Sequence, residues 1–210
     1  SKVVDGARRL GAARALGRGR PRPNDVWLLE ALVAHVAPGA TVLVVGSGEP
    51  WHESLCIALG AKRVDTVEYN NRVYQHDSLR QLPAAEFWRD ASAGRAGRYD
   101  VVLSASSLDH DGLGRYGDPI APDGDLLTMD LLRDVVGGVF LLSVPVGPDA
   151  ICWNLMRVYG SARLPLLLAG YEVAARYGYD ESRVDAPADN VRVTYEPVFA
   201  LTRADAGGEL

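Results

Sequence analysis

The stretch from Thr41 to Trp51 constrains the fold more than any other part of the sequence. Its first five residues, TVLVV, are uncharged and include three valines, which is typical of a fully buried strand in a parallel sheet. The following Gly46-Ser47-Gly48 lets the backbone turn sharply and approach a ligand closely. From Pro50 to Gly60, apolar residues recur at helical spacing. A buried strand, a glycine turn and a helix in this order predict a doubly wound α/β fold that presents backbone N–H groups to an anion or a nucleotide.

A second predicted strand, residues 63–69, carries the acidic residue Glu68 at its end. Glu68 follows the glycine turn by about 20 residues, the separation at which the dinucleotide fingerprint places an acid that binds ribose hydroxyls. An adenosine-bearing cofactor, either NAD or S-adenosylmethionine, is therefore the first hypothesis. The dinucleotide pattern requires a third glycine where this chain has Trp51, and a glycine-poor turn suits a ligand without a pyrophosphate. S-adenosylmethionine is the favoured cofactor, and an ordinary strand-to-helix turn is the alternative.

The rest of the chain alternates between segments of strand and helix character. Its 210 residues suit one domain with a sizeable core. The expected further strands are 78–82, 99–105, 139–144, 171–177 and 191–201, and the expected helices are 24–36, 84–91, 125–136 and a segment from Asp149 to about Met156. Gly137-Gly138 is expected to form a turn. We therefore predict an α/β fold with a doubly wound, mostly parallel sheet and an antiparallel C-terminal edge pair.

Residues 24–203 are expected to form this domain. An Arg-rich lead-in, residues 1–23, precedes it and could form a short helix over 5–16, and a flexible tail, 204–210, follows it. The arginines of the lead-in could contact phosphate, although a solvated segment is the simpler interpretation.

Composition excludes some classes of function. The net charge of −5 argues against broad nucleic-acid binding, and no apolar run reaches the roughly 18 residues that a membrane span requires. Cys56 and Cys152 fall in apolar patterns and are interpreted as buried small hydrophobes, which suits a reducing compartment such as the cytoplasm. The sequence leaves the oligomeric state open.

Most of the polar chemistry follows the predicted strand 99–105. Ligands of open α/β sheets lie beyond the carboxyl ends of the strands, and loops as long as residues 106–124 are often functional. The candidate residues here are Ser104, Ser106, Ser107, Asp109, His110, Asp111, Arg115, Tyr116 and Asp118.

His110 lies between two aspartates and has three interpretations. As a general base, it would have a pKa raised by Asp109 or Asp111, which would suit removal of a proton from a substrate hydroxyl. As a metal ligand, it would need partners that adjacent residues rarely provide, so no metal is predicted. As a structural residue, it would hold the loop through turn hydrogen bonds.

These residues resemble a known family. The segments that carry the resemblance are Val44-Val45-Gly46-Ser47, Pro50-Trp51, Gly60-Ala61-Lys62, Val67-Glu68-Tyr69-Asn70, residues 110–119 (HDGLGRYGDP), Val144-Pro145-Val146-Gly147, Trp153-Asn154, residues 157–160 and residues 163–167. Over about residues 41–171 they are similar to the domain of unknown function 268. That family is similar to class I S-adenosylmethionine-dependent methyltransferases, which implies a Rossmann-like methyltransferase fold and this cofactor. The family has Glu before the loop histidine where this chain has Asp109.

The function predicted from the sequence is methyl transfer from S-adenosylmethionine to an oxygen of a sugar, glycan or other polyol. The cofactor-binding residues would be Gly46, Ser47, Gly48, Trp51, Glu68, Tyr69, Ser104, Ser106 and Ser107. His110 would act as the base, assisted by Asp109 or Asp111. The acceptor would contact Arg115, Tyr116, Asp118, Trp153, Asn154, Arg157 and Tyr159.

Two alternatives come from other classes. One is a non-catalytic S-adenosylmethionine-binding module of a larger protein. The other is an NAD(P)-linked sugar-modifying oxidoreductase or epimerase, which would be expected to carry a Tyr-x-x-x-Lys pair, whereas Lys2 and Lys62 are the chain's lysines.

Overall fold

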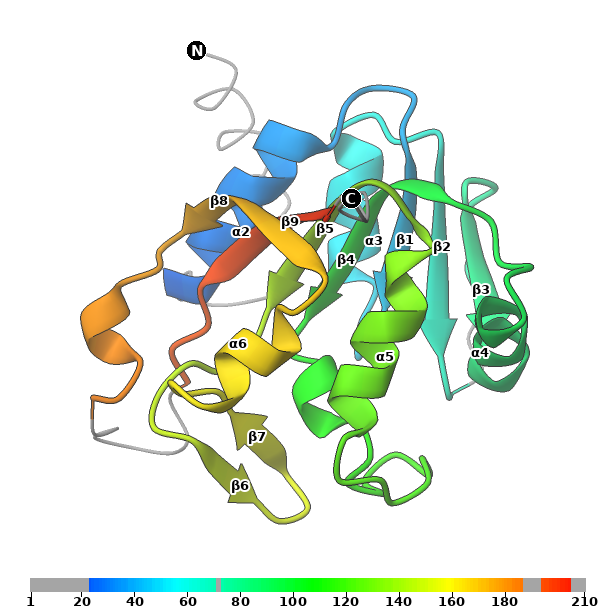
Figure 1. Ribbon diagram of the computed structural model, residues 1–210. Coiled ribbons are helices and arrows are strands. Elements are labelled where there is room, and N and C mark those ends of the chain that lie inside the picture. Colours follow the sequence, from blue (N-terminus) through cyan, green and yellow to red (C-terminus); the bar gives the residue numbers. More distant parts are fainter. Residues whose placement is uncertain (1–22, 71–72, 187–193, 205–210) are drawn as a thin grey trace, which may run out of the picture.

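The computed structural model describes residues 23–70, 73–186 and 194–204 (Figure 1). The sequence predictions for the Arg-rich lead-in, including the helix over 5–16, and for nearly all of the tail therefore lie outside the described residues. Within the described residues, a seven-stranded sheet forms the centre of the molecule and helices cover both of its faces (Figure 1).

The sheet has the strand order β3-β2-β1-β4-β5-β9-β8. Its strands are β1 (Thr41–Val45), β2 (Arg63–Glu68), β3 (Leu79–Pro83), β4 (Tyr99–Ala105), β5 (Val136–Ser143), β8 (Tyr171–Tyr177) and β9 (Val198–Arg203). The first five strands pair in parallel, whereas β9 runs antiparallel to both β5 and β8. The predicted doubly wound sheet with an antiparallel C-terminal pair is confirmed.

The sheet divides the hydrophobic core into two halves, and a layer of helices covers each half. The helices are α2 (Pro23–His35), α3 (Trp51–Ala58), α4 (Ala84–Ser92), α5 (Gly124–Arg133) and α6 (Arg163–Leu167), with short 3-10 turns η1 (Leu108–His110) and η2 (Glu181–Arg183). In β1, Val42 and Val44 pack with α2 and α3, while Leu43 and Val45 pack with α4, α5 and α6. Because both faces of β1 are covered, an uninterrupted apolar run is what this strand requires.

The site is positioned by the reversal of strand order at the centre of the sheet. From β1 the chain crosses to β2 and then β3 on one side, and it returns to β4 on the other side of β1. In such sheets a crevice opens outside the carboxyl ends of the strands at the point of reversal. The ends of β1 and β4 are therefore the expected walls of a ligand site.

The prediction of a helix after Asp149 is wrong. The chain instead forms a small hairpin of β6 (Ala150–Cys152) and β7 (Met156–Val158), outside the main sheet (Figure 1). Asp149 does have a capping role, because its carboxylate accepts hydrogen bonds from the backbone N–H groups of Gly160, Ala162 and Arg163 at 2.8–3.1 Å. Asp149 was therefore correctly predicted to cap a helix, but the helix that it caps is α6, which begins later in the chain.

The predicted boundaries around β5 and β9 also change. Gly137 and Gly138 lie within β5 rather than in a turn, and a Cβ on Gly138 would come within 2.4 Å of the carbonyl oxygen of Asp100. Glycine is needed there for close packing of two backbones. Strand β9 begins at Val198 rather than at 191, after Pro197, which has no N–H for a strand ladder; residues 191–193 lie outside the described residues.

Gly46 gives the first testable prediction. It has φ of +72°, and a Cβ there would lie 2.0 Å from Ser107 Oγ and 2.8 Å from Ser107 Cβ. We expect Gly46→Ala to lower the free energy of unfolding by at least about 2 kcal/mol, because it combines left-handed strain with overpacking. Urea denaturation measures the change. Gly48→Ala is the matched control, since a Cβ at Gly48 meets no described atom within 4 Å; equal losses in both variants would contradict the assignment.

Candidate functional site

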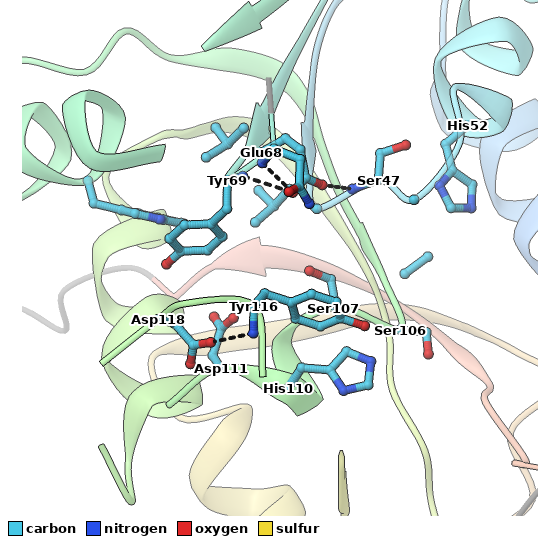
Figure 2. Close-up of a pocket in the computed structure, with 17 residues that line it drawn as sticks. Ser47, His52, Glu68, Tyr69, Ser106, Ser107, His110, Asp111, Tyr116 and Asp118 are labelled. Carbon is cyan, nitrogen blue, oxygen red and sulfur yellow. Dashed lines mark hydrogen bonds between the residues drawn. The ribbon is translucent and has the colours of Figure 1, made fainter. Parts of the chain in front are cut away.

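A cavity of about 260 Å³ lies at the carboxyl ends of β1, β2 and β4 (Figure 2). Its walls come from the glycine turn after β1, from the end of β2, from α4 and from the loop after β4. The lining residues are Val45, Gly46, Ser47, Gly48, His52, Val67, Glu68, Tyr69, Asn70, Trp88, Ala105, Ser106, Ser107, His110, Asp111, Tyr116 and Asp118. Figure 2 shows Glu68, Tyr69 and Ser47 on one side of this space, and Tyr116, His110, Asp111 and Asp118 on the other.

Ser47, in the glycine turn, is bound through both its backbone and its side chain. Its backbone N–H donates to Glu68 Oε2 at 3.0 Å. Its hydroxyl makes contacts with Glu53 Oε2 at 3.1 Å and with the carbonyl oxygen of Glu49 at 2.8 Å. The turn is therefore fixed from the strand side by Glu68 and from the helix side by Glu53.

Glu68 faces the cavity, and its carboxylate is engaged by backbone groups. Besides Ser47, the N–H groups of Tyr69 and Asn70 donate to Oε1 at 2.8 Å and 3.2 Å. A carboxylate offers about four acceptor positions, so three of them are occupied. Counting donors from the described residues only, one acceptor position of Glu68 remains, so a bidentate hydrogen bond to a ribose diol would require one backbone N–H to release the carboxylate.

The loop motif after β4 is built around Asp118. Its carboxylate accepts hydrogen bonds from the N–H groups of Gly112 and Gly114, at 2.8 Å and 3.1 Å, and of Tyr116 at 3.2 Å. Gly112 and Gly114 have φ of +77° and +72°, and a Cβ on Gly112 would lie 2.0 Å from the carbonyl oxygen of Ala121. The glycines and Asp118 thus specify a compact loop shape that aims other side chains at the cavity.

His110 is held at the cavity wall by the β6–β7 hairpin. Its Nδ1 donates to the carbonyl oxygen of Leu155, and Tyr116 packs edge-on against its ring at 5.5 Å between ring centroids. Burial, followed by the positive charges of Arg115 and Arg157, lowers the pKa of His110. The expectation of a raised pKa is therefore wrong, because the cost of desolvating an imidazolium outweighs the opposing effects of the Leu155 carbonyl and Asp118 on this pKa. His110 is neutral near pH 7, with its Nε2 lone pair available.

Asp109 is buried within the protein and does not belong to the cavity lining. Its side chain is fully buried, and neither carboxylate oxygen has a hydrogen-bond partner in the described part of the chain. The distance from Oδ2 to His110 Nε2 is 3.6 Å. Burial, with a further contribution from the charge of Glu196, raises the pKa of Asp109 well above its usual value. Burial thus favours the protonated form of Asp109 over the carboxylate that was expected to assist His110.

Asp111 lines the cavity and is the carboxyl group best suited to proton transfer. Its Oδ2 accepts a hydrogen bond from Thr128 Oγ1 at 2.8 Å. Burial, reinforced by the charges of Asp118 and Asp125, raises its pKa to about 7. A carboxyl group with this pKa exchanges its proton readily at neutral pH.

Arg157 and Tyr159 were expected to contact the acceptor, but both side chains are fully buried. Arg157 donates to the carbonyl oxygens of Asp111 and, at 2.9 Å, Pro122. Tyr159 donates to Asp125 Oδ2 at 2.9 Å. We therefore reassign them from substrate contact to support of the loop.

The remaining predicted residues lie outside the cavity lining. Trp51 begins α3 and packs against the core on that face, and Ser104 is buried in β4. Arg115 is exposed, with its guanidinium 5.7 Å from the centroid of the Tyr116 ring. Trp153 and Asn154 are exposed at the turn of the β6–β7 hairpin.

Sequence reasoning missed six lining residues, namely Val45, His52, Val67, Asn70, Trp88 and Ala105. Four of them adjoin the ends of β1, β2 and β4, which the sequence had already indicated, so the position of those three ends could have identified them. His52 and Trp88 lie on α3 and α4, where helical periodicity gives no sign of a cavity. Glu53, which supports the turn from behind, was also missed.

Neither a metal centre nor a membrane helix is found in residues 23–70, 73–186 and 194–204. No group of three or more His, Cys, Asp or Glu side chains there is arranged to hold a metal ion. No helix in these ranges combines the length and apolar character needed to span a bilayer.

Several solved structures resemble this fold. The 1,6-didemethyltoxoflavin-N1-methyltransferase of Burkholderia thailandensis, with bound 1,6-didemethyltoxoflavin and S-adenosylhomocysteine, superposes with a TM-score of 0.60 at 18% identity, over 84% of this chain and 76% of that one. A Listeria monocytogenes protein assigned as an S-adenosylmethionine-dependent methyltransferase superposes with a TM-score of 0.54 at 15% identity, over 84% of this chain and 95% of that one. The ribosomal protein L11 methylase of Lactobacillus delbrueckii subsp. bulgaricus superposes with a TM-score of 0.52 at 13% identity, over 88% of this chain and 80% of that one.

These similarities show a Rossmann-like methyltransferase fold. No curated protein matches the chain. A family model described as Caenorhabditis protein of unknown function, DUF268, matches residues 39–201, which include the glycine turn, Glu68 and the whole loop motif. The chain therefore belongs to the DUF268 family.

Proposed function

We propose that the chain is an S-adenosylmethionine-dependent methyltransferase that acts on a hydroxyl group of a sugar, glycan or other polyol. The observation that carries the proposal is a single cavity in which Glu68, at the end of β2, faces Asp111, on the loop after β4 (Figure 2). One wall thus offers an acceptor for ribose hydroxyls, and the other offers a group that can take a proton at neutral pH. The fold shared with known methyltransferases supports the same reading.

The residues of the cavity fit this cofactor. Gly46 approaches Ser107 so closely that a Cβ would collide with it, so glycine is what allows the turn and the loop after β4 to meet at the cavity. Gly46, Ser47 and Gly48 would face the methionine part, and Glu68, beside Tyr69, would bind the ribose. Ser106 and Ser107 would form the floor. S-adenosylmethionine would supply a methyl group on a positively charged sulfur, and the acidic lining of Glu68, Asp111 and Asp118 suits that charge.

Asp111 is the stronger candidate for the base. As its carboxylate, it would accept the proton from the acceptor hydroxyl as that oxygen takes the methyl group. Thr128 holds one carboxylate oxygen of Asp111, which fixes the orientation of the group. His110 is the second candidate, because Nδ1 is bound to the Leu155 carbonyl and Nε2 remains able to accept a proton. The two candidates differ in pKa, which separates them experimentally.

The acceptor is proposed to be a polyol because the cavity mouth combines hydrogen-bonding and aromatic groups. Tyr116 and Asp118 line the cavity, and Arg115 extends beside Tyr116. Trp153 and Asn154 lie on the hairpin that contacts His110 through Leu155, so they would be the outer part of an acceptor site. Amphipathic aromatic rings beside amide and guanidinium donors suit the mixed polar and apolar faces of a sugar ring.

The cofactor assignment predicts specific binding. Calorimetry should show that the chain binds S-adenosylmethionine, and NAD much more weakly. Glu68→Gln should raise the dissociation constant by the equivalent of about 1–3 kcal/mol, because one charged acceptor is lost. Glu86→Gln, on the exposed side of α4, is the matched control and should leave binding unchanged. Equal affinities for S-adenosylmethionine in all three proteins would reject the role of Glu68, and absence of binding would reject the cofactor.

The base assignment predicts a pH profile. Methyl transfer from labelled S-adenosylmethionine to a panel of sugars and glycans should rise with pH, reach half of its maximum near pH 7 and level off about one pH unit higher, because the Asp111 carboxyl must lose its proton to act as a base. Asp111→Asn should lower the rate by about a hundredfold or more. If His110 is the base instead, the midpoint of the rise in rate will lie below pH 6.5, the ordinary pKa of histidine, and His110→Ala will abolish this dependence of the rate on pH.

The same assay distinguishes an enzyme from a binding module. Cofactor binding without methyl transfer to any hydroxyl in the panel would favour a non-catalytic module. Transfer to a ring nitrogen, the kind of acceptor named for the Burkholderia protein, but to no hydroxyl would reject O-methylation and retain the methyltransferase.

A further inference from the structure

Glu53 is a buried carboxylate next to the proposed cofactor turn. It lies in the first turn of α3, and its side chain has no solvent exposure. Three hydroxyl groups lie within hydrogen-bond distance of its carboxylate: Ser47 Oγ at 3.1 Å from Oε2, and Thr66 Oγ1 and Tyr74 OH at 3.0 Å and 3.1 Å from Oε1. The Ser47 hydroxyl shares its one proton between Glu53 and the carbonyl oxygen of Glu49, which lies at 2.8 Å. In the described part of the chain, no Lys or Arg forms an ion pair with Glu53.

Burying a carboxylate without a cation is costly, and hydrogen bonds from hydroxyl groups offset only part of that cost. An apolar side chain at this position would avoid the penalty. The two oxygens of Glu53 also reach different parts of the structure. Oε1 binds Thr66 within β2 and Tyr74 beyond it, whereas Oε2 binds Ser47 in the glycine turn. Glu53 therefore connects the turn to the next strand through the first turn of α3.

The contact with Ser47 is the one that reaches the cavity. Ser47 lines the cavity, and its N–H is bound to Glu68 on the opposite side. With the hydroxyl bound to Glu53 and the N–H bound to Glu68, rotation of the Ser47 peptide would break at least one charge-assisted hydrogen bond. The direction of the turn's backbone is thus set before a ligand arrives.

We propose that Glu53 is a positioning residue that preorganises the glycine turn for its ligand by holding the hydroxyl of Ser47. It does not line the cavity, so it acts on the ligand through Ser47. Preorganisation increases affinity because less conformational freedom is lost on binding. The identification of the ligand as S-adenosylmethionine rests on the proposed function. The effect of Glu53 on the glycine turn is independent of that identification.

Hydrogen–deuterium exchange of the ligand-free protein tests the effect on the turn. Ser47→Ala and Glu53→Met should both accelerate exchange of the amides of residues 46–49 by about tenfold, because each removes the bond between Ser47 and Glu53. Thr66→Val is the matched control, since it removes a hydroxyl from the same carboxylate but not from the turn. It should leave the exchange of residues 46–49 unchanged, even where it lowers the melting temperature. Equal exchange of these amides in all four proteins would overturn the proposal.

Affinity for S-adenosylmethionine tests the effect on the ligand. Ser47→Ala and Glu53→Met should each weaken binding by about tenfold, and the double variant should bind no more weakly than the weaker single variant, since both remove one interaction. Additive losses would mean that Glu53 does not act through Ser47, and would overturn the proposal. Faster exchange with unchanged affinity would also overturn it. If the unaltered protein does not bind S-adenosylmethionine, the proposed function fails, and the exchange experiment still decides the role of Glu53.

Discussion

The close approach of Gly46 to Ser107 is the constraint on which the site depends. It brings the glycine turn after β1 against the start of the loop after β4, where the strand order reverses. Any side chain at Gly46 would push these two segments apart. Ser106, beside this contact, has φ of +50°, an unusual value for a residue with a Cβ. Both strand ends are thereby held at one cavity, where a ligand can contact them together.

Burial also determines the pKa values of the ionisable residues in the loop after β4. Arg157 has no exposed surface and binds the carbonyl oxygens of the loop, while its guanidinium lies 3.6 Å from Asp125 Oδ1. The packing that makes the loop compact also removes water from its acids. Asp111 and Asp109 consequently have raised pKa values, and His110 has a lowered one. The proton chemistry of the loop therefore follows from desolvation more than from the pairing of neighbouring charges.

The sequence predicted the central sheet well and some connections poorly. The apolar run of β1, the glycine turn and Glu68 were interpretable because each depends on local properties: burial on both faces, freedom of the backbone and the position of a strand end. The capping role of Asp149 and the need for glycine at 138 could be predicted locally, but the structural element that each residue serves depends on residues elsewhere in the chain. Asp149 caps α6 across the β6–β7 hairpin, and Gly138 makes room for Asp100 of the neighbouring strand. Sequence reasoning selected most of the polar cavity lining, but not His52 and Trp88, which two helices contribute.

Local properties of the sequence were sufficient to predict the class of fold, the order of strands and helices up to β5, and the presence of acids after β2 and β4. These features follow from hydrophobic periodicity and from the backbone requirements of glycine and proline, which act within a few residues. The folded arrangement was needed to show that Arg157 supports the loop from within the protein, that Glu53 contacts Ser47, and that Asp111 rather than Asp109 lines the cavity. Solvent exclusion and hydrogen-bond partners decide these properties, and both are supplied by segments that are distant in the chain.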